Sequence, residues 1–172
     1  RLQDEKKVWE KFSHCNVLPF IGTAMFDGHR HLVSPYMRRG NLCTFIRSYP
    51  SADRVSLLRQ AAFGLVYLHD EKRFVHGDIK PQNIFVSDSF EAQIADFGVT
   101  KLGLAVTSTG RRGKRSLDYL APELVNPQHP NQPDDRVPQS TTRTAESDVY
   151  AFGITIAQEG GFSGIWEQVS LI

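Results

Sequence analysis

Apolar residues along the chain recur with two different spacings, and each spacing predicts a different kind of element. From Ser51 to about His69 they recur every three or four residues, which is typical of a helix with one buried face. We expect Ser51 to be its N-cap. Ser147 is expected to cap a second apolar helix over residues 148–158. The buried face of the first helix is predicted to contain Val55, Leu58, Ala61, Ala62, Leu65 and Leu68.

Two further helices are predicted from weaker patterns. Residues 2–12 are highly charged and have few apolar positions, so we expect a helix that lies on the molecular surface and is stopped by Pro19. A short helix is expected over residues 41–46. It ends at Tyr49, because the residue before a proline avoids helical geometry.

Short runs of β-branched and aromatic residues predict strands. Val17–Met25 and His31–Met37 flank the turn signal Asp27-Gly28, which predicts an antiparallel pair. Residues 126–143 contain four prolines and almost no apolar residues, so we expect a loop insertion there. Three shorter apolar pieces are expected to be small strands that present loops: Phe74-Val75, Ile84–Val86 and Gln93–Ala95.

Composition narrows the class of protein. The 172 residues, 40% of them hydrophobic, suffice for one domain with a core. Lys and Arg number 20 and Asp and Glu 19, so the charge indicates neither nucleic acid nor an anionic membrane as a partner. The sequence has neither an apolar membrane span nor a leader, and we expect a cytoplasmic protein with upstream residues missing before Arg1. Cys15 and Cys43 are expected to be reduced, buried thiols.

The loop from His76 to Asn83 carries the strongest chemical signal. Asp78, Lys80 and Asn83 follow one another closely enough to converge from one tight loop. A carboxylate can orient an attacking hydroxyl and accept its proton. A cation can offset charge on a transferring phosphoryl group, and an amide oxygen can ligate Mg²⁺. This set of side chains therefore predicts phosphoryl transfer.

A second carboxylate follows soon after the loop. Asp96 begins the sequence Asp96-Phe97-Gly98, thirteen residues after Asn83 and directly after a predicted strand. If Asp96 faces the first loop, it completes a metal site at the phosphates of a nucleotide. Either carboxylate alone fits an ordinary loop residue, but the two together, in this order and spacing, favour a site.

These motifs resemble those of the eukaryotic protein kinase family, most closely its tyrosine-kinase-like group of Ser/Thr kinases. His76–Asn83 is similar to the catalytic loop H-R-D-L-x-x-x-N, and Asp96–Gly98 is similar to the metal-binding D-F-G. Ala121–Glu123 is similar to the A-P-E that closes the activation segment. Ser147–Gly153 is similar to the start of the family's buried central helix. The resemblance extends to about Ala157.

The resemblance implies transfer of the ATP γ-phosphate to Ser or Thr of a protein substrate, with Mg²⁺ as cofactor. Asp78 would be the catalytic base, and Lys80 the cation at the γ-phosphate. Asn83 and Asp96 would ligate the metal. Asp148 would accept backbone N–H bonds from the catalytic loop, which is a structural role.

The resemblance also implies an α+β fold with two lobes. Residues 1–37 would form a partial N-lobe and the hinge, with the family's C helix, which carries Glu5, and short antiparallel strands. Residues 38–172 would form an incomplete, mainly helical C-lobe that contains the proline-rich insertion. In the hinge, the carbonyl of Pro35 and the N–H and C=O of Met37 would hold adenine.

The chain departs from the family pattern at several places. Gly77 stands where the family has an arginine that binds an activation-loop phosphate, so phosphorylation of that loop loses its main docking cation. The basic cluster at residues 111–115 could bind an acidic substrate segment, but a solvated loop is favoured. The hydroxyls available for modification in the loop are Thr107, Ser108, Thr109 and Ser116.

Elements are also missing at both ends. A glycine-rich loop and a strand lysine do not precede Glu5, and the arginine that pairs with Glu123 in the family does not follow. A buried carboxylate without a partner is costly. We therefore expect the isolated chain to be marginally stable and to bind ATP weakly.

Two other functions stay open. Small-molecule phosphotransferases of the aminoglycoside or choline kinase type also use a His-Gly-Asp loop, although the D-F-G and A-P-E motifs of this chain favour a protein kinase. A pseudokinase that scaffolds a partner protein fits the missing front, but the intact residues at 78, 80, 83 and 96 argue against it. Lys80 favours Ser/Thr over Tyr as the acceptor. The sequence identifies neither the physiological substrate nor the oligomeric state.

Overall fold

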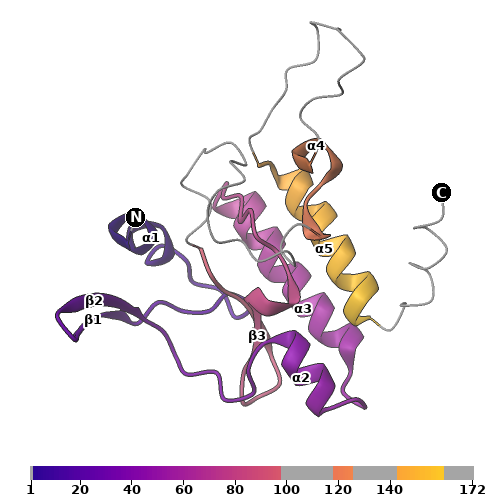
Figure 1. Cartoon of the computed structure of the whole chain (residues 1–172), viewed down its shortest axis with the longest axis horizontal. Helices are drawn as coiled ribbons and strands as arrows, with labels where there is room; N and C mark the ends of the chain where they lie inside the picture. Colours follow the sequence, from indigo (N-terminus) through magenta and orange to yellow (C-terminus); the bar gives the residue numbers. More distant parts are fainter. Residues whose placement is uncertain (1, 98–117, 126–142, 161–172) are drawn as a thin grey trace, which may run out of the picture.

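The computed structural model describes residues 2–97, 118–125 and 143–160, and its elements follow an α+β order (Figure 1). The α-helices are α1 (Leu2–Trp9), α2 (Leu42–Ser48), α3 (Arg54–Val66), α4 (Pro122–Val125) and α5 (Ala145–Glu159). The strands are β1 (Gly22–Phe26), β2 (His29–Val33), β3 (Ile84–Val86) and β4 (Ala92–Ile94). A π-helical turn (Tyr67–Glu71) extends α3, and a 3-10 turn (Pro81–Asn83) precedes β3. The predicted α+β class is confirmed.

Several predictions fall outside the described residues. These are Gly98, the hydroxyls at 107–116, the basic cluster at 111–115 and residues 126–142 of the proline-rich insertion. Within the described ranges, none of the helices combines the length and the apolar character needed to cross a bilayer. Both cysteines are free, but Cys15 is exposed and Cys43 only half-buried, so the prediction of buried thiols was wrong.

Two clusters of buried residues form the core. The first joins α1 and the end of α3 to β4 and α5, and it is rich in aromatic rings. The second is mainly aliphatic and lies among α2, α3 and the β3–β4 hairpin. Phe152 of α5 packs against both clusters and so connects them. Figure 1 shows α1 and the β1–β2 hairpin on one side of the molecule, and α3 and α5 on the other.

Helix α1 is shorter and more deeply packed than predicted. It ends at Trp9, ten residues before Pro19, and Phe12 follows in a turn. The Trp9 indole N–H donates to the Leu18 carbonyl at 2.6 Å, and both Trp9 and Phe12 are buried. The helix is therefore anchored by its last turn rather than lying free on the surface. Aromatic rings at the end of a charged segment supply this anchor.

The antiparallel pairing and the turn of the β1–β2 hairpin are confirmed, although the strands are shorter than predicted and lie closer to the turn. Its strands pair antiparallel, with Phe26 opposite His29. Asp27 and Gly28 both have positive φ, which is the geometry of the tight two-residue turn that such a pair of residues favours. Most of its side chains are exposed, including those of Met25 and Phe26.

The N-cap residues of α2 and α3 are both polar residues that accept a backbone N–H from the first turn. Asn41, at the start of the helix expected over residues 41–46, is the N-cap of α2, and its side chain accepts the Thr44 N–H at 3.0 Å. The N-cap of α3 is Asp53 rather than Ser51, because the Asp53 carboxylate accepts the Ser56 N–H at 2.9 Å. The helix starts later as a result, and Val55 in its first turn is exposed rather than buried. The buried residues of α3 are Leu57, Leu58, Ala61, Gly64 and Leu65.

The two small strands that flank the candidate site pair with each other. β3 and β4 form an antiparallel pair, as expected of segments that present loops. Phe74-Val75 is not a strand, so that prediction was wrong. The Phe74 N–H instead donates to the Leu68 carbonyl at 2.9 Å, which closes the turn after α3. The Phe74 ring packs into the aromatic cluster, which accounts for its apolar character.

Helix α5 begins three residues before the predicted start. Its N-cap is Thr144, whose hydroxyl accepts the Ser147 N–H at 3.3 Å. The Ser147 hydroxyl in turn accepts the Thr144 N–H at 3.0 Å, so the two residues form a reciprocal capping box. Ser147 is therefore the third helical residue and not the cap. This start places Asp148 in the first turn of α5, facing the loop at 76–83.

Candidate active site

His76 connects the loop at 76–83 to the end of β4. Its side chain is fully buried. Its Nε2 lies 2.9 Å from the Ala95 carbonyl oxygen, and its Nδ1 lies 3.2 Å from the Asp78 backbone nitrogen. A carbonyl can only accept and an amide N–H can only donate, so the ring carries its proton on Nε2 and accepts at Nδ1. His76 thereby fixes the backbone of Asp78 relative to the strand that precedes Asp96.

Asp148 holds the same loop from the opposite side. Its carboxylate is 1% exposed and accepts the backbone N–H groups of His76 and Gly77, each at 2.7 Å. It also accepts a hydrogen bond from His69 Nε2 at 3.0 Å, at the end of the helical segment that precedes the loop. The predicted structural role of Asp148 is confirmed. Bonds to a buried ionised acceptor are among the stronger hydrogen bonds in proteins.

The three polar side chains of the loop converge, as their spacing predicted. Lys80 Nζ lies 2.6 Å from Asp78 Oδ2. The Asn83 amide N–H₂ donates to the same oxygen at 3.0 Å and to the Asp78 backbone carbonyl at 2.8 Å. Because the amide nitrogen of Asn83 faces Asp78, its amide oxygen is the group that could ligate a metal ion. The arrangement offers a carboxylate, a cation and an amide oxygen within one loop.

Asp96 adjoins this set through the backbone. The Ala95 N–H donates to the Asn83 carbonyl at 2.9 Å, so the residue before Asp96 is bonded to the predicted metal ligand. Asp96 has a φ of 68°, in the left-handed region, and its side chain is exposed. An exposed carboxylate in a conformation that few residues adopt is a pattern typical of functional positions.

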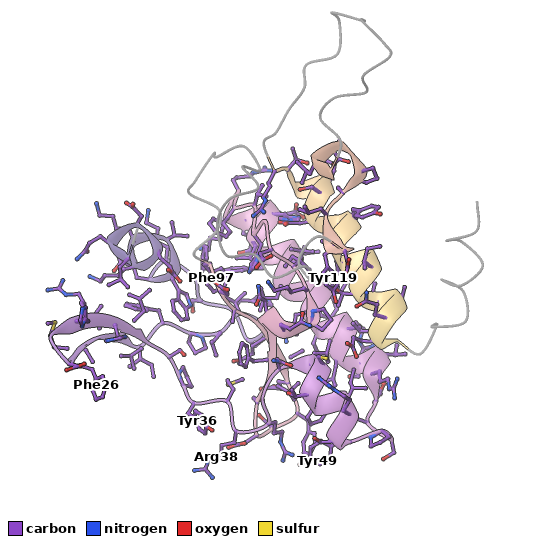
Figure 2. All side chains as sticks on the ribbon, in the orientation of Figure 1. Phe26, Tyr36, Arg38, Tyr49, Phe97 and Tyr119 are labelled. Atoms are coloured by element: carbon purple, nitrogen blue, oxygen red, sulfur yellow. The ribbon has the colours of Figure 1, made fainter. Side chains whose placement is uncertain are left out.

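Phe97 anchors Asp96 from the other side. Its ring is 2% exposed and has neighbours at centroid distances of 5.1 to 5.6 Å. Those rings are Trp9, Phe12 and His76. Asp96 is thus held between a buried aromatic side chain and a strand paired in the core. Figure 2 shows Phe97 in the interior, whereas Phe26 lies at the edge of the hairpin.

The donors present fit Mg²⁺ better than a transition metal. In the described part of the chain, no group of three or more His, Cys, Asp or Glu side chains is arranged to hold a metal ion. An amide oxygen from Asn83 and a carboxylate from Asp96 are hard oxygen donors, as Mg²⁺ prefers, and Mg²⁺ usually completes its coordination with water and phosphate oxygens. The protein side therefore has the donor chemistry for a Mg²⁺-nucleotide.

The predicted hinge residues lie between β2 and α2. Pro35 and Met37 are half-buried, and Tyr36 between them is exposed. Met37 packs against the aromatic core cluster. The Met37 carbonyl accepts the Gly40 N–H at 2.9 Å and keeps a second lone pair that can accept another hydrogen bond. Glu5, on α1, is half-buried.

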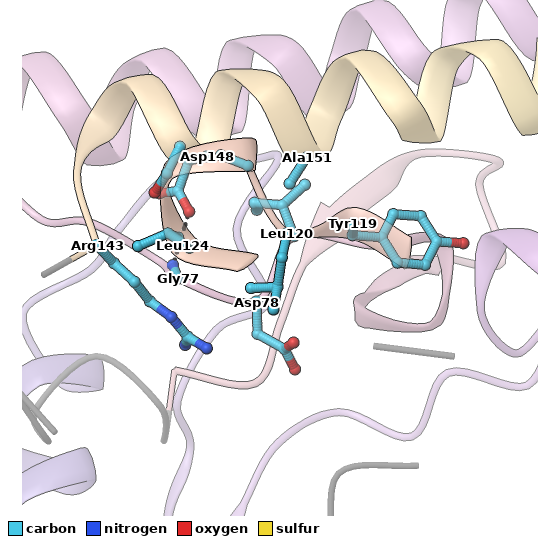
Figure 3. Close-up of a pocket in the computed structure, with 11 residues that line it drawn as sticks. Gly77, Asp78, Tyr119, Leu120, Leu124, Arg143, Asp148 and Ala151 are labelled. Carbon is cyan, nitrogen blue, oxygen red and sulfur yellow. Dashed lines mark hydrogen bonds between the residues drawn. The ribbon is translucent and has the colours of Figure 1, made fainter. Parts of the chain in front are cut away.

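A small pocket lies beneath the loop and contains residues that the sequence did not single out (Figure 3). Arg143, just before α5, reaches across to Gly77. Glu123 is exposed, so the expectation of a buried carboxylate without a partner was wrong. The pocket is lined by Gly77, Asp78, Ile79, Tyr119, Leu120, Ala121, Leu124, Arg143, Ser147, Asp148 and Ala151.

Tyr119 lies at one end of this pocket. Its hydroxyl donates to Gln158 Oε1 at 2.5 Å. Burial, and to a lesser extent the neighbouring Glu159, raises the pKa of the Tyr119 phenol to about 12. The same burial raises the pKa of the Glu159 carboxyl. Neither pKa shift could be predicted from the sequence, because Gln158 and Glu159 are nearly forty residues from Tyr119.

The chain matches the family model described as "Protein kinase domain" over residues 1–162. It is 36% identical over 153 residues to the G-type lectin S-receptor-like serine/threonine-protein kinase LECRK3 of Oryza sativa subsp. indica. It is 33% identical over 159 residues to chitin elicitor receptor kinase 1 of Arabidopsis thaliana. These alignments cover 84% and 88% of the chain but only 17% and 23% of the relatives. The chain therefore spans less than a quarter of the length of the curated relatives it matches.

Proposed function

Because the chain belongs to the protein kinase family, we propose that it carries the phosphoryl-transfer centre of a Ser/Thr protein kinase. The observation that supports this most directly is the convergence of Lys80 and Asn83 on the carboxylate of Asp78. The relatives are named as serine/threonine-protein kinases, which agrees with a hydroxyl acceptor. Lys80, two residues after the proposed base, is the pattern that favours Ser or Thr.

In the proposed mechanism, Asp78 orients the acceptor hydroxyl and takes its proton. Its carboxylate is 14% exposed, and the hydrogen bond that the Asp78 backbone N–H donates to His76 Nδ1 limits its movement. Lys80 holds a positive charge beside the carboxylate, where the γ-phosphoryl group of ATP would carry negative charge. The loop is thus preorganised before any substrate binds.

Asn83 and Asp96 are proposed to hold Mg²⁺, which would neutralise charge on the nucleotide phosphates. Pro35 and Met37 are proposed to bind adenine through backbone groups. In this proposal, residues 1–37 form the N-lobe side and hinge, and residues 38–172 form the C-lobe. A domain that uses ATP and keeps free thiols is expected in the cytoplasm, which we also propose.

The test is phosphate transfer from labelled ATP to peptides that differ only in Ser, Thr or Tyr. Asp78→Asn keeps the size of the side chain and removes the base, so we expect the rate to fall about 10²–10⁴-fold. Asp88→Asn is the matched control, since Asp88 is an exposed acid in the β3–β4 turn. Equal rates for Asp78→Asn and the parent chain would contradict the proposal.

A binding experiment tests the metal ligands separately. Asp96→Asn and Asn83→Ala are expected to weaken ATP binding in Mg²⁺ and to leave binding in EDTA unchanged. If the parent binds Mg²⁺-ATP but transfers no phosphate to any peptide, the scaffolding alternative is favoured. Transfer to a small amino alcohol or aminoglycoside, and not to peptides, would favour a small-molecule phosphotransferase.

A further inference from the structure

We propose that Arg143 is a positioning residue for the Asp78 loop, and that it fills the place of the side chain that Gly77 lacks. The proposal rests on the proposed function, because the loop matters to phosphoryl transfer only if Asp78 is the base. The family resemblance concerns the position of Gly77 alone, whereas the contact with Arg143 is a feature of this structure.

The Arg143 side chain lies in the space beside Gly77, and it would have to move if residue 77 carried a side chain. A Cβ atom built on Gly77 would lie 2.7 Å from Arg143 Cδ and 3.0 Å from Arg143 Nη1. Real Cβ atoms essentially never have neighbours at the shorter distance. The Arg143 side chain therefore occupies the space in which a residue with a side chain at position 77 would begin. Figure 3 shows Arg143 extending toward Gly77 from the start of α5.

The start of α5 brings two anchors to the loop. Asp148, in the first turn, accepts the N–H groups of His76 and Gly77. Arg143 directly precedes Thr144, the N-cap, whose reciprocal bonds with Ser147 fix the direction in which the chain enters the helix. The hydrogen bonds thus restrain the loop from Asp148, and the Arg143 side chain lies close to Gly77.

Gly77 is the position in the loop that most needs such a restraint. It has a φ of 77°, and glycine has more backbone freedom than any other residue. It lies between His76, which is fixed by its buried ring, and Asp78, whose carboxylate must keep its orientation. Motion at Gly77 would rotate the Asp78 backbone directly. A side chain packed on Gly77 limits that motion.

Charge gives Arg143 a second effect on the loop. Asp78 and Asp148 line the same pocket as Arg143. A guanidinium group beside two acids in a partly buried pocket offsets their mutual repulsion more strongly than it would in water. Packing and charge both predict that replacing Arg143 loosens the loop, and a lysine or a methionine at that position separates the two effects.

The first test measures amide hydrogen exchange by NMR on the chain, and it requires no phosphoryl transfer. Arg143→Ala is expected to speed exchange of the Gly77 and Asp78 amides at least about 10-fold, an opening free energy lower by about 1.4 kcal/mol. Amides in the middle of α3, such as that of Leu65, should be unchanged. Arg59→Ala, an exposed arginine on α3, is the control and should change neither.

A uniform change in all amides would mean that Arg143 only stabilises the fold as a whole, and would overturn the proposal. No change at Gly77 and Asp78 would also overturn it. Because exchange is read without ATP, a failure here is distinct from a failure of the proposed kinase activity.

The second test is a double-mutant cycle followed by thermal unfolding. Asn tolerates positive φ better than most residues with a Cβ, so Gly77→Asn limits the backbone strain while it forces the Arg143 side chain to move. We expect Gly77→Asn to lower Tm by about 2–4 °C more in the parent than in the Arg143→Ala background. Equal losses in the two backgrounds would show that the two residues are independent, against the proposal.

If the chain transfers phosphate, kinetics add a third readout. Arg143→Ala is expected to lower kcat with little change in the KM for ATP, because the loop and not the nucleotide site is altered. Arg143→Lys should restore part of kcat if charge matters, and Arg143→Met if packing matters. A rise in the KM for ATP with unchanged kcat would contradict a positioning role.

Discussion

The loop at 76–83 and the β1–β2 hairpin are held in opposite ways. The loop has almost no regular structure, yet bonds from Asp148 and from the His76 ring to Ala95 tie it to other elements, and Asn83 bonds back to Asp78 within it. The hairpin has ideal pairing, but its strands contact mainly each other and most of its side chains are exposed. Regular structure is therefore a poor guide to how firmly a segment of this molecule is held.

The difference has a physical basis and a consequence. Hydrogen bonds to a buried charge cannot be exchanged for bonds to water without exposing that charge, so breaking one is costly. A two-stranded hairpin alone is marginally stable in water. We expect opening of the loop to cost more free energy than opening of the hairpin, which opens by itself. The residues proposed for chemistry lie on the firmly held segment.

Asp148→Ala should have the largest effect, because it removes the acceptor for two backbone N–H groups and for His69. We expect the free energy of unfolding, measured by urea denaturation, to fall by about 3–5 kcal/mol. The control is Glu146→Ala in the same turn, an exposed residue whose pKa is lowered by hydrogen bonding at the helix start. If the two substitutions cost the same, the loop is not held as described.

Phe97→Leu and Phe26→Leu compare a buried with an exposed ring. Phe97 is 2% exposed and Phe26 is 74% exposed. The first change leaves a gap in the aromatic cluster and should lower the free energy of unfolding by about 1–2 kcal/mol. The second should stay within about 0.5 kcal/mol. Comparable losses would mean that the hairpin is packed in solution against something else.

Gly28→Ala tests whether the hairpin opens independently. Gly28 has a φ of 71° and open space around it, so an added Cβ causes backbone strain and no clash. We expect faster hydrogen exchange in β1 and β2, equivalent to about 1 kcal/mol, and no change at His76 or Asp78. Gly28→Asn, which tolerates this conformation, should have a smaller effect. A change that reached the loop would couple the two regions.

Tyr119 should matter only at alkaline pH, and so has the smallest effect under ordinary conditions. Burial raises its pKa in the folded chain to about 12, above the usual value of 10.0 for a tyrosine phenol. The folded state therefore keeps the proton longer than the unfolded state, and stability is lost as the pH rises from about 10 to about 12. Tyr119→Phe should flatten this loss in thermal unfolding at pH 9 to 12. An unchanged pH profile would assign the loss to other groups.

Much of the candidate site could be predicted because its parts are close in sequence. Asp78, Lys80 and Asn83 lie within six residues, so a tight loop leaves them few ways to avoid one another. The sequence predicted that Asp96 follows a strand. It could not give the distance between Asp96 and Asn83. Their roles in catalysis stay predictions until phosphate transfer is tested.

The prediction errors share a cause. Ser51 and Ser147 are good N-cap residues, but Asp53 and Thr144 took those positions. When several residues near a helix start can cap it, tertiary packing of the first turn decides which of them becomes the N-cap. The helix that contains Trp9 was predicted to lie on the surface, but Trp9 is buried. A narrow apolar stripe in the sequence does not show how deeply a ring at the end of the helix inserts into the core.

The sequence by itself determined the types of element, their order and the chemistry of the loop, because periodicity, turn residues and short spacings act over a few residues. Only the tertiary structure decided which side chains pack against residues that are distant in the sequence. Arg143 over Gly77 and the ring of His76 between Asp78 and Ala95 are examples. Contacts between residues far apart in the chain are set by how whole elements pack, and packing depends on shape and volume that no local pattern records.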